Sequence, residues 1–192
     1  MSQYPLPAIN CLAFVAYSGA RIVLERFYVT GQPPAAAYPA IAQAQIGSVL
    51  CVREPGEAVA PPPVPPPPPF DEHEAATLAQ LGVAYTNIPI TRTMTQAQFD
   101  TAATEAALVL LTNAAQGSTL VHCSTGDRAS SVFAAMLIAL GVPNADAVLY
   151  ATNSLLLANA NIIALVNGYR PPAAAIEEIR AAASAAALPA MR

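Results

Sequence analysis

An α/β fold with a mainly parallel central sheet is expected for this chain, because apolar segments of strand length alternate along it with longer helical segments. A strand followed by a helix occurs four times in succession, and only helices follow. We therefore expect about four to five strands flanked by helices, with an all-helical C-terminal part. The 192 residues are enough for one sizeable core, so a single domain is expected over residues 1–192.

The expected strands are short and rich in β-branched and aromatic residues, whereas the expected helices are marked by caps and terminating glycines. Thr95 stands where it can cap the long helix that follows it, and Gly47 and Gly82 each follow a helical segment. Strands are expected at 21–30 (one or two), 48–52, 83–90 and 118–122, and helices at 35–46, 70–81, 96–115, 129–140, from 143 onward, around 153–167 and at 172–187.

Residues 60–69, APPPVPPPPP, form a segment of low complexity. Proline lacks the N–H donor that a sheet needs and breaks helices, so this segment is expected to adopt the polyproline II conformation. Patterned sequence resumes on both sides of it, which indicates a stiff surface loop within the domain. A second interpretation is a docking peptide for a proline-recognition module.

The composition argues against several classes of protein. The net charge is −4 and all eight basic residues are arginines, so nucleic-acid binding is not expected. We find no run of about 20 strongly apolar residues and no basic N-terminal region, so neither a membrane span nor a secretory signal is expected. The three cysteines, Cys11, Cys51 and Cys123, are too few and too widely spaced for a disulfide framework or a zinc site. The expected compartment is the cytoplasm, with an organelle stroma as the alternative.

The most informative segment lies where the strand 118–122 ends and the helix 129–140 begins. Cys123 stands at the end of the strand, and Arg128 follows five residues later. Active sites of parallel sheets lie at the carboxyl ends of strands. The first turn of a helix offers unpaired N–H groups that bind anions, and a thiolate placed there is stabilised as a nucleophile. These residues predict an anion site with a nucleophile at its base; the alternative is a buried structural cysteine.

The neighbouring residues supply the other parts of such a site. Gly126 allows the backbone to curl back without a Cβ clash, and the Arg128 guanidinium can hold two oxygens of a tetrahedral anion. The ring of His122 is placed to fix the loop by a hydrogen bond, and Ser130 or Ser131 to donate one to the sulfur. The predicted site comprises Cys123, Asp127 and Arg128 as catalytic residues, and His122, Ser124, Thr125, Gly126, Ala129, Ser130 and Arg53 as binding residues.

The segment 122–128, HCSTGDR, resembles the signature of the cysteine-dependent phosphatases, the dual-specificity and tyrosine phosphatase superfamily. The usual loop has five residues between cysteine and arginine, whereas this one has four, the spacing of the beta-lactamase-hydrolase-like phosphatases, also called DUF442. Segments 27–33, 48–57 and 81–90 also resemble that family, and the likeness covers about residues 22–141. It implies a phosphatase-like fold, a phosphocysteine intermediate and no cofactor or metal. Arg53 then lines the pocket or pairs with Glu54 or Glu57.

The resemblance also implies a general acid, which the superfamily supplies as an aspartate in a loop before the cysteine. Here the corresponding loop, 91–95, has no carboxylate. Asp127 is the better candidate, since some lipid phosphatases of the superfamily carry an aspartate inside the cysteine loop. A structural ion pair with a neighbouring arginine is the alternative role for Asp127. Ala129 stands where the superfamily usually has a serine or threonine.

Three functions follow from this segment. The first is hydrolysis of a phosphate monoester by attack of Cys123 on phosphorus, with Arg128 holding the equatorial oxygens. The second is a rhodanese-like sulfurtransferase that carries a persulfide on Cys123, since those enzymes also use a short cysteine loop. The third is a catalytically weak protein that binds phosphorylated ligands. The expected ligand is in each case a phosphorylated substrate or a small oxyanion.

Overall fold

The computed structural model describes residues 8–11, 20–24, 26–57 and 70–188. In this part of the chain, six strands form one sheet in the order β1-β2-β3-β6-β4-β5. The strands are β1 (Ala8–Cys11), β2 (Ala20–Val23), β3 (Phe27–Thr30), β4 (Ile46–Cys51), β5 (Ala84–Asn87) and β6 (Ser118–His122). The four strands from β3 to β5 pair in parallel, whereas β1 and β2 extend the edge at β3 as antiparallel strands. The expected α/β fold with a mainly parallel sheet is confirmed.

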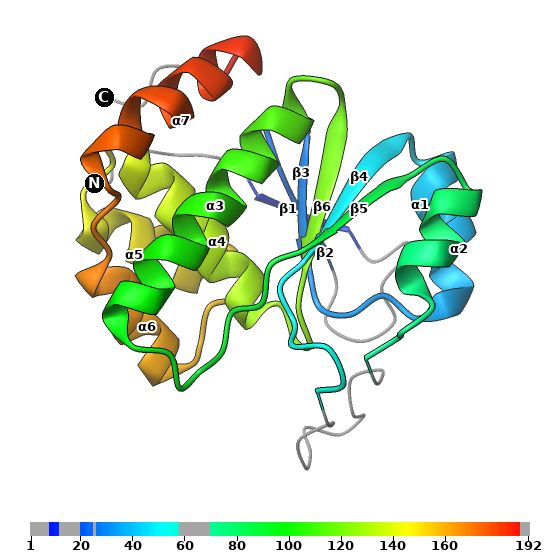
Figure 1. Cartoon of the computed structure of the whole chain (residues 1–192), viewed down its shortest axis with the longest axis horizontal. Helices are drawn as coiled ribbons and strands as arrows, with labels where there is room; N and C mark the ends of the chain where they lie inside the picture. Colours follow the sequence, from blue (N-terminus) through cyan, green and yellow to red (C-terminus); the bar gives the residue numbers. More distant parts are fainter. Residues whose placement is uncertain (1–7, 12–19, 25, 58–69, 189–192) are drawn as a thin grey trace.

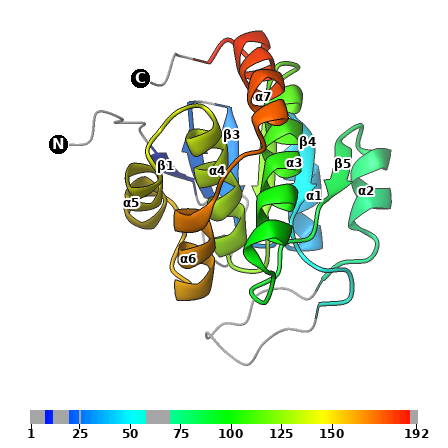
Figure 2. The ribbon, with the colours of Figure 1, turned by 60° about the vertical axis from the view of Figure 1, so that its left-hand side comes forward.

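Two layers of helices cover the sheet (Figure 1). One face is covered by α1 (Tyr38–Gln43) and α2 (Glu74–Gln80), with the short 3-10 turn η1 (Ala35–Ala37) leading into α1. The other helices are α3 (Gln96–Ala114), α4 (Asp127–Ala139), α5 (Asn144–Ser154), α6 (Ala160–Gly168) and α7 (Ala173–Ala185). They gather on the opposite side, with α4 lying between α3 and α5 (Figure 2).

The sheet also divides the hydrophobic core into two clusters, one beneath each layer of helices. Successive strand residues point to opposite faces, so Val49 packs in a small cluster beneath α1 and α2 while Leu50 packs in the large cluster beneath α3 and α4. Every residue of α4 is buried. Its Phe133 meets Phe27 of β3 edge to face, with 5.5 Å between ring centroids. The N-terminal end of this buried helix follows the cysteine loop directly.

Several helices differ from the expected bounds at their ends. The helix 96–115 is confirmed as α3, and Thr95 forms the N-terminal capping box with Gln98. The helix expected from residue 129 begins two residues earlier, which places Asp127 and Arg128 in the first turn of α4. The helix expected around 153–167 is shorter, because α5 ends at Ser154 and Asn159 caps the new helix α6 through its side chain.

Two further expectations concern the outside of the molecule. The proline-rich segment 60–69 lies outside the described residues, so its assignment as a surface loop stays a prediction. Among the helices of the described ranges, none has both the length and the apolar character needed to cross a bilayer.

Candidate active site

The cysteine loop lies at the carboxyl end of the parallel strands, between β6 and α4. Cys123 follows directly after β6, and Gly126 directly precedes α4. The backbone of the adjacent turn after β3 holds the loop, because the N–H of Gln32 donates to the carbonyl of Ser124 at 3.1 Å. On the other side, the N–H of Val52 donates to the carbonyl of His122 at 2.9 Å. The loop is thus fixed between the ends of β3 and β4.

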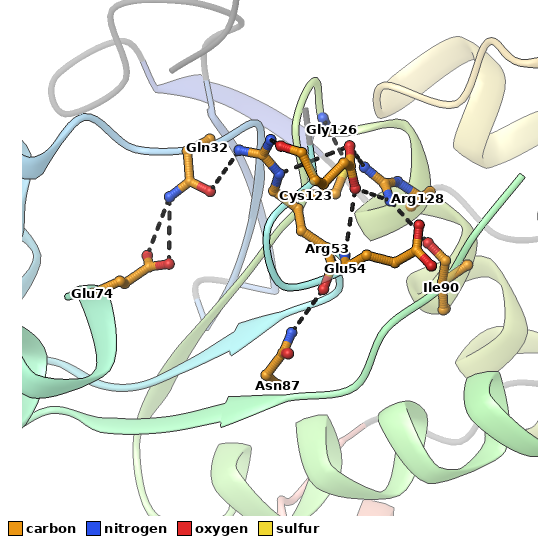
Figure 3. A network of polar contacts seen from close by, with 10 residues as sticks. Gln32, Arg53, Glu54, Glu74, Asn87, Ile90, Cys123, Gly126 and Arg128 are labelled. Atoms are coloured by element: carbon orange, nitrogen blue, oxygen red, sulfur yellow. Dashed lines mark hydrogen bonds and ion pairs between the residues drawn. The ribbon is translucent and has the colours of Figure 1, made fainter. Parts of the chain in front are cut away.

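The Cys123 sulfur lies inside this loop and is buried. The N–H of Gly126 donates to Sγ at 3.1 Å, so the backbone curls around the sulfur (Figure 3). The curl requires φ of 93° at Gly126, a left-handed conformation that residues with a Cβ disfavour. A Cβ at this position would also overlap the side chain of Leu156. The sequence indicated the first reason for glycine here, but the contact with Leu156 is visible only in the structure.

The guanidinium of Arg128 lies beside the loop and already binds an anion. Nη1 and Nη2 donate to Oε2 and Oε1 of Glu57, each at 2.7 Å, and Nη1 also donates to the carbonyl of Ile90 at 2.9 Å. Although burial alone lowers the pKa of Arg128, the bond with Glu57 and the nearby Cys123 sulfur hold it above its usual value. The arginine that the sequence assigned to an oxyanion is therefore paired with an internal carboxylate.

Arg53 contacts the same carboxylate from a second direction. Its guanidinium is buried, donates to Oε1 of Gln32 at 3.1 Å, and places Nε 3.9 Å from Oε1 of Glu57. Asn87 fixes the turn that carries it by donating to the carbonyls of Cys51 and Arg53. Burial is the main reason that the pKa of Arg53 lies below its usual value. Arg53 thus pairs with Glu57 and, through it, lies next to Arg128.

Glu57 is the acidic residue that contacts both arginines, and the sequence named it only as a possible partner of Arg53. It lies in the turn after β4, and 21% of its side chain is exposed. Burial alone raises its pKa, but Arg128 and Arg53 outweigh that effect and hold the pKa below its usual value. The only signal in the sequence was its position four residues after Arg53, which indicated an acidic turn and nothing about Arg128.

No described hydrogen bond joins Asp127 to the Cys123 sulfur, and Oδ2 of Asp127 is buried without a hydrogen-bond partner among the described residues. Its Oδ1 accepts from the N–H groups of Ala158 and Asn159, each at 2.8 Å, in the loop before α6. Neither of the two roles considered from the sequence, general acid or ion pair with an arginine, is visible in these contacts. Asp127 instead connects the first turn of α4 to the segment that leads into α6.

The hydroxyl groups after Arg128 also have other partners than the sulfur. Ser130 Oγ donates to the carbonyl of Gly126 at 2.8 Å and accepts from the N–H of Leu156, and Ser131 Oγ donates to the carbonyl of Arg128 at 2.7 Å. The expected hydrogen bond from either serine to Cys123 is therefore wrong for this structure. Ala129 is buried and carries no hydroxyl, Ser124 is buried, and Thr125 is half-buried.

His122 belongs to a second buried group under the loop, together with Cys51 and Glu74. Nε2 of His122 lies 3.1 Å from Oε1 of Glu74, and both side chains are fully buried. Burial alone lowers the pKa of His122, but Glu74 and Cys51 raise it well above its usual value. For the Cys51 thiol, burial acts upward and His122 outweighs it, so the pKa is lowered. The ring of His122 thus pairs with Glu74, and the expected hydrogen bond from this ring to the loop is not found among the described contacts.

Among the described residues, these three each provide one atom that could bind a metal ion, and the three atoms lie within 4.8 Å of one another. Their chemistry suits a soft divalent ion. Glu74 is already paired with His122 and also accepts from Gln32 Nε2 at 3.4 Å. Gln32 joins it to Arg53, and a chain of polar contacts extends from Glu74 to Arg128 (Figure 3).

Comparisons with known proteins identify the fold. No family model and no curated protein matches the sequence. Among solved structures, TpbA of P. aeruginosa is 16% identical, with 95% of this chain and 99% of that chain covered and a TM-score of 0.64. The core catalytic domain of the PP-IP phosphatase SIW14 from S. cerevisiae is 15% identical over 86% of this chain and 91% of that chain, with a TM-score of 0.59.

A DUF442 protein from Shewanella putrefaciens CN-32 is a third structure of this kind. It is 17% identical over 80% of this chain and 90% of that chain, with a TM-score of 0.56. The likeness extends over most of each chain in all three cases. The chain therefore has the α/β fold of these three proteins, which is the fold that the resemblance of its cysteine loop implied.

Proposed function

We propose that this protein is a cysteine-dependent phosphatase that hydrolyses a phosphate monoester through a phosphocysteine. The observation that supports the proposal is that Cys123 and Arg128 lie together at the junction of β6 and α4, with the arginine near the sulfur. The thiol lies at the end of β6, the arginine lies in the first turn of α4, and the arginine already holds a two-oxygen anion, the Glu57 carboxylate. A phosphate presents the same pair of oxygens to a guanidinium fork.

In the proposed reaction, the Cys123 thiolate attacks phosphorus while Arg128 holds two equatorial oxygens. The N–H groups of the loop and of the first turn of α4 stabilise the charge that develops on the phosphoryl oxygens. The N–H of Gly126 already donates to the sulfur at 3.1 Å, so one donor of the loop faces the proposed nucleophile. Water then cleaves the S–P bond and releases phosphate. Arg53, Ser124, Thr125 and Ala129 are proposed to line the pocket.

The comparison structures suggest which substrates to test first. A cysteine-to-serine variant of TpbA was crystallised in complex with pTyr, and SIW14 is named a PP-IP phosphatase. An aryl phosphate related to phosphotyrosine is therefore the first substrate class proposed for this chain. From the sequence we further propose one domain over 1–192, a location in the cytoplasm, and docking of a proline-recognition module at 60–69.

The direct test is phosphate release from phosphotyrosine and phenyl phosphate by the purified full chain. We expect turnover by the wild type, none by Cys123→Ser, and turnover close to that of the wild type by Cys51→Ser, which removes the other buried described thiol. A cyanide and thiosulfate assay runs beside it. Undiminished phosphate release by Cys123→Ser, or sulfur transfer without phosphate release, contradicts the proposal.

A further inference from the structure

The Arg128 guanidinium can donate a pair of hydrogen bonds from each of two edges, and Glu57 uses only one of them. An arginine side chain carries five N–H groups in a rigid plane. Nη1 donates to Glu57 and to the carbonyl of Ile90, and Nη2 donates once to Glu57 (Figure 3). These three bonds occupy the end edge of the plane. They leave the N–H of Nε and the second N–H of Nη2, which lie next to each other on the side edge.

The side edge of Arg128 lies at the cysteine loop. Its Nε is buried and has no hydrogen-bond partner among the residues that the structure describes. The Cys123 sulfur is close to the guanidinium, since it helps to hold the pKa of Arg128 above its usual value. Arg128 also follows two residues after Gly126, whose N–H donates to that sulfur at 3.1 Å. A buried cationic donor without an acceptor is costly, so this edge is suited to an anionic ligand beside the sulfur.

Contacts from several sides hold the Glu57 carboxylate at the end edge. Besides the two bonds from Arg128, the N–H of Glu54 donates to Oε2 at 3.4 Å, and Nε of Arg53 lies 3.9 Å from Oε1. Nη2 of Arg53 also donates to the backbone carbonyl of Glu57 at 3.4 Å. Because the two arginines hold the pKa of Glu57 below its usual value, the side chain remains a carboxylate at neutral pH. Glu57 is therefore a fixed anionic partner of Arg128.

We propose that Glu57 is a positioning residue, which stays bound to Arg128 during the reaction and directs the side edge of the guanidinium, Nε and Nη2, to the phosphoryl group at Cys123. This role rests on the phosphatase reaction proposed above. The phosphate takes two donors on the side edge, while Glu57 and the Ile90 carbonyl keep theirs. No bond of the resting site has to break when the substrate binds.

The benefit of this arrangement lies in orientation. An arginine side chain is long and has several rotatable bonds, so a guanidinium without partners samples many directions. Glu57 and Ile90 fix the plane of the Arg128 guanidinium before the substrate arrives. Donors that are already aimed at the phosphoryl oxygens need no reorganisation when charge develops there. Because the effect concerns the phosphoryl group and not the leaving oxygen, it should be equal for good and poor leaving groups.

The first test compares two substrates that differ in their need for an acid. Phenyl phosphate has a poor leaving group, whereas 2,4-dinitrophenyl phosphate leaves readily without a proton. For Glu57→Gln we expect kcat to fall about 10- to 100-fold and by the same factor on both substrates, because an amide cannot accept from both nitrogens of the end edge. Glu54→Gln, which changes an exposed acid of the same turn, should behave as the wild type. A loss confined to phenyl phosphate, or no loss on either substrate, overturns the positioning role.

The second test determines whether Glu57 acts through Arg128. In Arg128→Lys the ammonium has no planar edge to orient, so a further Glu57→Gln substitution should lower kcat on 2,4-dinitrophenyl phosphate by no more than about twofold. The two single losses should thus be far from additive. Additive losses contradict the proposal, because they show that Glu57 contributes independently of Arg128. Urea unfolding of each variant shows whether it is folded.

The side edge itself can be observed by NMR through the N–H signal of Nε. Among the signals of the eight arginines, that of Arg128 is the one absent from the spectrum of Arg128→Lys. Titration of the wild type with inorganic phosphate should shift this signal, because Nε gains an acceptor. A signal that stays in place while phosphate inhibits turnover overturns the assignment of the side edge to the phosphate.

These outcomes differ from a failure of the phosphatase function. If the wild type turns over neither substrate, the phosphatase function is overturned and the role of Glu57 with it. If the wild type is active and Glu57→Gln departs from the expected pattern, only the positioning role is overturned. The first failure appears already in the wild type, and the second appears in the variants or in the NMR titration of an active protein.

Discussion

Arg128 and Glu57 form a bidentate ion pair, with both terminal nitrogens of the arginine 2.7 Å from the two carboxylate oxygens. The two residues are 71 positions apart in the chain and come from different elements, the first turn of α4 and the turn after β4. The pair brings a cation, an acid and, through the cysteine loop, a thiol to one edge of the sheet. The proposed phosphatase reaction depends on that arrangement.

Replacing Arg128 by lysine should reduce kcat/KM on phenyl phosphate by about 100-fold or more, because an ammonium cannot hold two phosphate oxygens in the planar geometry of a guanidinium. Steady-state kinetics at several pH values measure the loss. Arg180→Lys is a suitable control, since that arginine is exposed on α7 and pairs only with the nearby Glu177 among its described contacts. A lysine variant with wild-type kinetics is incompatible with a phosphate held by the fork.

Gly126→Ala should destabilise the protein for two separable reasons. The positive φ disfavours alanine by about 1 kcal/mol, and the new Cβ overlaps Leu156, which adds a similar or larger cost. The free energy of unfolding in urea measures the sum. In a double-mutant cycle, Leu156→Ala should recover the overlap but not the φ strain. Strictly additive losses from the two substitutions speak against a clash between these side chains.

Asp127→Ala should lower the free energy of unfolding by about 1–3 kcal/mol, because it leaves two backbone N–H groups without their acceptor. Asp127→Asn keeps an oxygen acceptor and should cost less. Neither variant should show a turnover loss specific to phenyl phosphate over 2,4-dinitrophenyl phosphate. Such a specific loss in Asp127→Asn restores Asp127 as the general acid that the sequence suggested.

The buried pair of His122 and Glu74 should make stability depend on pH. The pKa of His122 is raised in the folded protein, from about 6.5 in the unfolded chain, so its contribution is complete below that pH. The contribution is then lost as the pH rises toward the folded pKa. We expect the free energy of unfolding to fall as the pH rises above about 6.5, and to fall less steeply in Glu74→Gln.

The wild type and Glu74→Gln are best compared with the substitution Cys51→Ala present in both. The pKa of the Cys51 thiol is lowered in the folded protein, so its own contribution grows with pH and opposes that of His122. Urea unfolding at each pH gives the two curves. Parallel curves with and without the Glu74 carboxylate contradict a charged His122–Glu74 pair.

The parts of the site that could be predicted from the sequence are those fixed by neighbours along the chain. Cys123, Gly126 and Arg128 follow a strand and open a helix, and this local order alone indicated a loop that binds anions. Glu57 and Glu74 were not assigned to the site, since their contacts with Arg128 and His122 depend on which strands lie side by side. Asp127 was assigned by its nearness in sequence, but its position in the first turn of α4 directs Oδ1 to the loop before α6.

The fold shows the same limit. Segments with clear periodicity, such as 96–115 and 118–122, fold as expected, and Thr95 caps the helix that follows it. The four residues of β1 have no such pattern, and their strand conformation comes from pairing with β2. The break between α5 and α6 was missed because Asn159 looks like one polar residue in a helical run, whereas its side chain caps a new helix.

The central claim, that Cys123 carries the phosphoryl group, is tested most directly by trapping the intermediate. The full chain is mixed with 32P-labelled phenyl phosphate and quenched in acid during turnover, and the labelled peptide is then identified by mass spectrometry. We predict label on the peptide that contains Cys123 and none in Cys123→Ser. Phosphate release that proceeds with no label on Cys123, or with label on another residue, contradicts a phosphocysteine mechanism.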